Sequence, residues 1–203
     1  MNTLRHSILL IMSLVCLQGM AQNKKIVFNQ SQKEFLQEQA RARVVKFQEN
    51  CATIGHKSGT KSSKMLLIKQ TMSLFVDDKR TIIVTHLNGK RDGAKLVSLY
   101  LNRLHLLGYK KVEITSSNFH ISTEIRPSAT MNDLHPGEDW YECICSVIQR
   151  FRGETWEYVY SDTVQRDFTV YLKRNMIVEG TEEHESWQVF IGDIEAQTIS
   201  AGV

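Results

Sequence analysis

The cysteines are the residues of this sequence with the most distinctive chemistry, and their spacing favours a structural role. Cys143 and Cys145 stand two apart on a predicted strand, so they share one face about 7 Å apart at Cα, which is poor disulfide geometry. No base adjoins them to activate a nucleophile, and Cys-x-Cys without a paired histidine is a weak metal pattern. Cys51 could pair with one of them if the first helix packs on that strand; otherwise all three are buried thiols.

The remaining polar candidates also have structural interpretations. Gln149 lies on a strand face otherwise filled by Val and Phe, where a buried amide needs partners from a ligand or from neighbouring groups. Asp77 and Asp78 are consecutive, so their side chains diverge and suit a helix end or turn. The sequence has no metal-ligand spacing and no Gly-rich phosphate loop, so no catalytic residue, metal or cofactor is predicted. One last cluster is typical of an exposed hairpin or of a pocket rim: Tyr158, Tyr160 and Asp162.

Three helices are predicted before any long strand. Ser31 with Glu34 forms a capping box for the first helix, which Gly55 ends. The second helix spans about residues 63–75, and the third runs from about residue 95 to Leu107 and is closed by Gly108. The first helix carries one apolar stripe at spacings of three and four: Leu36, Ala40, Val44, Phe47 and Cys51.

The rest of the chain has the period-two pattern of strands. A short strand at residues 82–84 precedes the third helix, and longer strands follow at 112–121, 141–151, around 168–172 and from 187 through Ile194 to Ile199. Residues 126–139 are predicted as a loop, 152–154 as a turn and 179–185 as an acidic loop. The order of elements predicts an α+β fold, with one domain over residues 22–203.

The N-terminus predicts export. Arg5 and His6 precede an apolar run of about ten residues, too short to span a membrane, and Gly19-Met20-Ala21 suits cleavage after Ala21. The alternatives are a buried N-terminal helix, or lipidation at Cys16, although Val15 stands where a lipobox prefers Gly or Ala. We therefore expect a signal peptide at 1–21, a periplasmic or extracellular protein, and no integral membrane segment after cleavage.

The charges are divided between the two halves of the chain. Residues 22–111 hold 18 Lys and Arg against 6 Asp and Glu, whereas residues 112–203 hold 6 against 16. The basic half could bind an acidic partner, or the halves could attract each other within one chain or between two copies. No basic patch with interleaved aromatic residues indicates nucleic-acid binding.

The order of elements, with Phe75-Val-Asp-Asp before the first strand and Trp187 and Gly192-Asp193-Ile194 near the end, resembles the NTF2-like superfamily over roughly residues 30–199. That superfamily includes nuclear transport factor 2, ketosteroid isomerase and SnoaL-like polyketide cyclases. The resemblance implies a cone in which a curved, mostly antiparallel sheet wraps around the helices and leaves a pocket at its wide end. It also implies, for the isomerases, an Asp base near the first strand and a Tyr donor on the first helix. Neither is present, because the base position falls near Val84, Thr85 or His86 and the first helix lacks Tyr.

Three hypotheses about function follow. The first is an exported, non-catalytic domain that forms a homodimer through its sheet and binds a small apolar or amphipathic ligand or a protein partner. The second is a SnoaL-like or isomerase-like enzyme with an altered site, using His86 or Gln149 beside Tyr100. The third is an accessory subunit of an envelope assembly. The predicted pocket-lining residues are His86, Tyr100 and Gln149.

Overall fold

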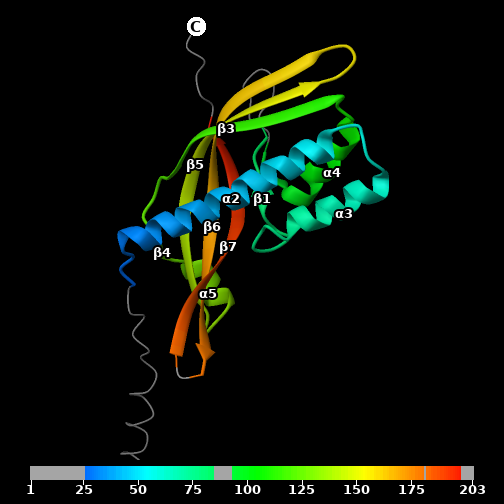
Figure 1. Ribbon diagram of the computed structural model, residues 1–203. Helices are drawn as coiled ribbons and strands as arrows, with labels where there is room; N and C mark the ends of the chain where they lie inside the picture. Colours follow the sequence, from blue (N-terminus) through cyan, green and yellow to red (C-terminus); the bar gives the residue numbers. More distant parts are fainter. Residues whose placement is uncertain (1–25, 85–92, 181, 198–203) are drawn as a thin grey trace, which may run out of the picture.

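The computed structural model describes residues 26–84, 93–180 and 182–197. His86, the predicted strand end at Ile199 and the predicted leader with Cys16 lie outside these residues. Three helices, α2 (Gln30–Gly55), α3 (Lys61–Met72) and α4 (Val97–Leu107), pack with a sheet of seven strands, so the predicted α+β class is confirmed. In Figure 1, α2 runs obliquely across the strands and α3 and α4 lie beside its C-terminal end.

The sheet is mixed, because one short strand runs parallel to its neighbour. The strand order is β2-β1-β7-β6-β5-β3, with β4 paired to β5, and only β1 and β7 pair in parallel, with Ile82 opposite Ile194, in the described part of the chain. The strands are β1 (Thr81–Ile82), β2 (Lys95–Leu96), β3 (Lys111–Ile121), β4 (Arg126–Pro127), β5 (Asp139–Glu154), β6 (Val159–Glu179) and β7 (Glu182–Gln197).

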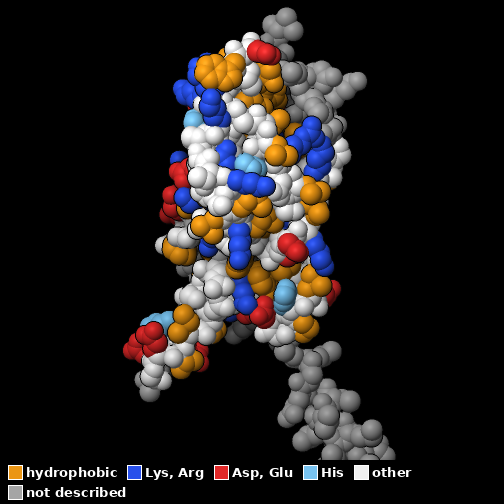
Figure 2. All heavy atoms as spheres, turned by 90° about the vertical axis from the view of Figure 1, so that its right-hand side faces the viewer, with side chains coloured by type: hydrophobic (Ala, Val, Ile, Leu, Met, Phe, Trp, Pro, Cys, Tyr) orange, Lys and Arg blue, Asp and Glu red, His pale blue; other side chains and the backbone are white. Residues whose placement is uncertain are grey.

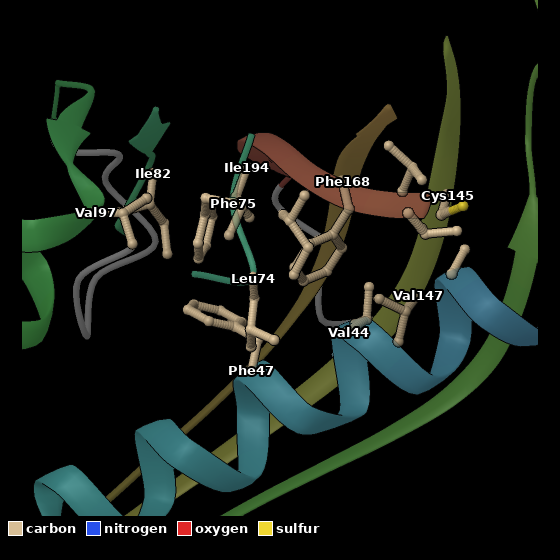
Figure 3. Close-up of a cluster of buried hydrophobic side chains, with 14 of the residues drawn as sticks. Val44, Phe47, Leu74, Phe75, Ile82, Val97, Cys145, Val147, Phe168 and Ile194 are labelled. Carbon is tan, nitrogen blue, oxygen red and sulfur yellow. The ribbon is translucent and has the colours of Figure 1, made fainter. Parts of the chain in front are cut away.

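The apolar stripe of α2 is buried as predicted, and it faces the middle of the sheet. Figure 3 shows Val44 and Phe47 pointing from α2 toward Val147, Cys145 and Phe168 on the strands. The same face of β5 that alternation predicts is buried, from Tyr141 to Gln149. This face and the helices enclose the main core.

Helix α2 begins earlier than predicted. Asn29 is its N-cap: its Oδ1 accepts a hydrogen bond from the Gln32 amide at 2.8 Å, while Gln32 Oε1 accepts one from the Asn29 amide at 3.1 Å. This pair has the same capping-box spacing as Ser31 and Glu34, and Asn caps as well as Ser. Buried Phe28, whose ring lies 5.4 Å from that of Tyr141, fixes the chain immediately before this cap.

The predicted turn at 152–154 is wrong, and the predicted loop at 179–185 is longer than the turn that the structure shows there. Residues 152–154 continue β5, where Gly153 pairs with Tyr160, and β6 and β7 pair as far as Glu179 and Glu182. Gly153 marks a close approach, since a Cβ there would lie 2.7 Å from the ring of Tyr109. The turn after β6 uses Gly180 at φ 66°, a conformation that favours glycine.

The predicted loop at 126–139 contains structure of its own, so the helix count exceeds the expected three. Strand β4 and the short helix α5 (Ala129–Leu134) lie within it, with Ser128 as the α5 N-cap. Met131 of α5 is buried against Trp140 and Tyr171, which form a second small cluster apart from the main core. A segment that contains Pro127, Pro136 and Gly137 thus packs against part of the sheet.

The three cysteines in the described residues are free and buried. Burial raises the pKa of the Cys51 thiol, and a hydrogen bond with Cys143 together with burial raises that of Cys145. The Cys51 and Cys145 thiols therefore stay protonated at neutral pH. Among the described helices, none is both long and apolar enough to cross a membrane.

The Asp77-Asp78 pair takes the turn role that consecutive carboxylates suggest. Asp77 Oδ1 accepts a hydrogen bond from the Lys79 amide at 2.8 Å, and its two oxygens accept from Arg80 Nε and Nη2 at 2.9 and 2.6 Å. Asp193 Oδ1 on β7 in turn accepts from the Thr81 amide at 2.7 Å. These bonds hold β1 at the edge of β7.

Replacing Asp77 by asparagine is expected to lower the free energy of unfolding by about 1–2 kcal/mol at pH 7, because charge-assisted bonds are lost. The hydrogen bond from Arg80 holds the pKa of Asp77 below its ordinary value. The contribution is therefore complete above the unfolded pKa of about 3.9 and disappears as pH falls through the lower folded pKa. Urea unfolding between pH 2 and 7 measures the difference. Asp78→Asn, at an exposed neighbour, is the control; equal losses for both variants would contradict the assignment.

Candidate functional site

A cavity of about 440 Å³ lies between α4 and the ends of β5 and β6 that form their hairpin. This volume falls in the range of about 300–1,000 Å³ typical of small-molecule sites. Leu99, Leu107 and Tyr158, which line it, are each more than half exposed, so the cavity opens to solvent.

One wall of the cavity is a face of α4. Spacings of three and four residues bring together the side chains that line the cavity from this helix. Leu104 and the neighbouring Leu101 are buried and fix the helix against the core, while Gly108 at φ 57° ends it. The residues that α4 contributes are Leu99, Tyr100, Arg103, Leu104 and Leu107.

The opposite wall is aromatic. The ring of Phe151 on β5 lies 5.8 Å from that of Tyr109 and 5.6 Å from that of Tyr160 on β6. Tyr109 is held from both sides, because its amide donates to the Gly55 carbonyl at 3.0 Å and its carbonyl accepts from the Lys57 amide at 2.6 Å. The end of α2 thereby positions one aromatic face of the cavity.

Gln149 lines the cavity from the middle of β5 and is almost completely buried. Its Oε1 accepts a hydrogen bond from Gln48 Nε2 of α2 at 3.1 Å, and Gln48 Oε1 accepts one from Ser116 Oγ of β3 at 2.8 Å. This chain of hydrogen-bonded side chains connects α2, β3 and β5 below the cavity. It satisfies two buried polar side chains that would otherwise destabilise the core.

Arg166 also lines the cavity, and its environment is unusual. Only 6% of the residue is exposed, and its Nη1 donates a hydrogen bond to the carbonyl of Ile83. No carboxylate of the described residues forms an ion pair with it, and the rest of its guanidinium has no hydrogen-bond partner among them. Burial lowers the pKa of Arg166, opposed by nearby Tyr100 and Asp162, yet arginine remains charged at neutral pH.

The two tyrosine hydroxyls near Arg166 remain protonated. Burial raises the pKa of Tyr100, and burial with the neighbouring carboxylate of Asp162 raises that of Tyr160 to about 12. The Tyr160 hydroxyl donates to Asp162, and the Tyr100 hydroxyl can donate a hydrogen bond to a ligand at neutral pH. Asp162 is the single carboxylate among the described residues that line the cavity, and it has interactions of its own with neighbouring groups.

Two of the three predicted pocket residues, Tyr100 and Gln149, lie in the wall of this one cavity. His86 is not among the described residues. Sequence reasoning missed Arg166, although it was detectable: the strand alternation Val164, Arg166, Phe168 places an arginine on an otherwise apolar face.

No protein-family model and no curated protein matches this sequence. A crystal structure from Novosphingobium aromaticivorans, named “Putative Scytalone Dehydratase”, aligns with a TM-score of 0.46 and 10% identity over 83% of this chain and 88% of that chain. This likeness assigns no activity.

The surface around α3 and α4 differs from the cavity in character. Figure 2 shows lysine and arginine side chains scattered among hydrophobic ones on this side of the molecule.

Within the described residues, no group of three or more His, Cys, Asp or Glu side chains could hold a metal ion. The cavity can offer a ligand apolar contact, the Tyr100 hydroxyl, the Gln149 amide and the buried positive charge of Arg166.

Proposed function

We propose that this chain is an exported NTF2-like domain that binds a small ligand with an apolar body and catalyses no reaction of its own. The observation that carries the proposal is the open cavity of about 440 Å³ between α4 and the sheet. Val84, one of the positions where the resemblance would place the isomerase base, lines this cavity with an apolar side chain. Valine cannot abstract a proton, so Val84 itself cannot act as the isomerase base.

The same proposal includes cleavage after Ala21 and a homodimer formed through the sheet. The opposite charges of the two halves of the sequence support pairing between copies. Native mass spectrometry of the exported protein tests both points. A monomer at high concentration would contradict the dimer, and residues retained before Gln22 would contradict the cleavage site.

The fluorescent probe N-phenyl-1-naphthylamine, which is apolar and uncharged, is expected to bind the purified protein with one site per chain. Leu107→Trp places a larger side chain at the cavity wall. It is expected to raise the dissociation constant of the probe at least about fivefold, because added side-chain volume in a packed site is unfavourable. Leu106→Trp is the matched control, because Leu106 is 79% exposed on the same helix and is not part of the wall. Fluorescence titration measures the three dissociation constants. Absent binding, or equal weakening by both variants, would reject the cavity as the binding site.

A further inference from the structure

The arginine in the cavity gives the proposed ligand a chemical identity. A guanidinium has five N–H donors, and removing its charge from water without a partner costs several kcal/mol. Arg166 uses Nη1 on the Ile83 carbonyl, and the described residues give the remaining donors no partner. Arg166 is nine-tenths buried and part of a cavity wall, and within residues 26–84, 93–180 and 182–197 no carboxylate forms an ion pair with it, although Asp162 attracts it. An anion that enters the cavity could therefore bind its remaining donors.

The charges around the cavity agree with an anionic ligand. Arg166, Lys95 and Arg103 line it, against the one carboxylate of Asp162. Arg103 is exposed, so its charge is screened by water, whereas that of Arg166 is not. The positive charge of Arg166, which Asp162 offsets in part, therefore favours a ligand with a single negative charge over one with several.

The shape of the anion follows from arginine geometry and from the walls. The planar fork of a guanidinium matches the two oxygens of a carboxylate, which it can bind through two parallel hydrogen bonds. The protonated hydroxyl of Tyr100 lies in the same wall and can donate a further one. The rings of Tyr109, Phe151 and Tyr160 offer apolar contact to the remainder of the ligand.

We infer that the cavity binds an amphipathic monocarboxylate, with its carboxylate on Arg166 and its apolar body along the aromatic wall. This inference rests on the proposed function and specifies its ligand class. At about 30 Å³ per water-sized group, a cavity of 440 Å³ suits a ligand of roughly 10–15 non-hydrogen atoms. Decanoate and its neutral counterpart 1-decanol are therefore suitable test compounds.

The test is displacement of N-phenyl-1-naphthylamine by decanoate and by 1-decanol at pH 7.5, where the acid is ionised. In the wild type, decanoate is expected to bind at least about tenfold more tightly than 1-decanol, since a hydrogen bond to a charged group exceeds a neutral one. Arg166→Met is expected to remove this preference while 1-decanol still binds. Arg41→Met, which removes an exposed cation on α2 outside the cavity wall, is the control and is expected to keep the preference.

The outcomes separate the two proposals. Equal binding of decanoate and 1-decanol in the wild type would overturn the carboxylate inference and leave the proposed function standing, whereas failure of the probe itself to bind would reject both. A preference that persists in Arg166→Met would exclude Arg166 as the anchor. If Arg166→Met does not fold, Arg166→Lys replaces it. Lysine keeps a charge but lacks the planar fork, so a reduced preference supports the inference and an unchanged one overturns it.

Discussion

Replacing Phe168 by alanine is expected to lower the free energy of unfolding by about 3–5 kcal/mol. Phe168 is completely buried on β6, where it pairs with Cys145 on one side and Ile194 on the other. Its ring lies 6.3 Å from that of Phe47 on α2, so it joins the helix layer to the centre of the sheet (Figure 3). Truncation leaves a cavity that strands paired on both sides cannot close.

Urea unfolding measures this loss as a lower midpoint with an unchanged slope. Phe35→Ala is the matched control, because Phe35 is 52% exposed on the outer side of α2. It removes the same atoms and is expected to change stability by about 0.5 kcal/mol or less. Since domains are commonly stable by about 5–15 kcal/mol, the Phe168 variant would lose a large share of that total. Losses of similar size in both variants would contradict the placement of the core.

Local periodicity predicted the elements of this core because burial on one face leaves a repeat in the sequence. The α2 stripe, from Leu36 to Cys51, recurs every three or four residues and is buried throughout. The alternation from Tyr141 to Gln149 placed the buried face of β5 in the same way. Both patterns are set by neighbours in the chain, so they could be recognised without knowing the tertiary structure.

The strand ends could not be predicted, because they depend on contacts with distant residues. Gly153 was expected in a turn, but the ring of Tyr109 covers its place in β5, and Tyr109 is itself held by the end of α2. The acidic run near Glu182 was expected in a loop, but its backbone pairs with the end of β6. Composition alone cannot distinguish a charged hairpin from a charged loop.

The site was only partly predictable for a similar reason. Gln149 stood out as a polar residue within an apolar pattern, and its partner Gln48 comes from 101 positions away in the chain. Arg166 breaks the same kind of pattern on β6, but the sequence does not reveal whether such an arginine has a carboxylate partner. Only the packing of α4 over the sheet places Tyr100, Gln149 and Arg166 around one cavity.

Replacing Arg166 by methionine is expected to raise the free energy of unfolding, in the absence of ligand, by about 1–3 kcal/mol. Burying a charge costs several kcal/mol, and Arg166 has no ion pair among the described residues, whereas the hydrogen bond lost at the Ile83 carbonyl contributes about 1 kcal/mol. Ile83 is half-buried, so water can replace that bond. Methionine is similarly long and flexible and can fill the space between α4 and the strands.

The control is Arg41→Met, which removes an exposed charge outside the cavity and is expected to change stability by about 0.5 kcal/mol or less. Decanoate provides the second comparison. At a concentration one hundred times its dissociation constant, a bound ligand adds about 2.7 kcal/mol to the stability of the wild type. The Arg166→Met protein is expected to gain much less stability from decanoate, so decanoate would offset the stability advantage of the variant.

A variant that is less stable than the wild type without ligand would indicate that other groups of the protein already compensate the charge of Arg166. The cavity would then need no anion.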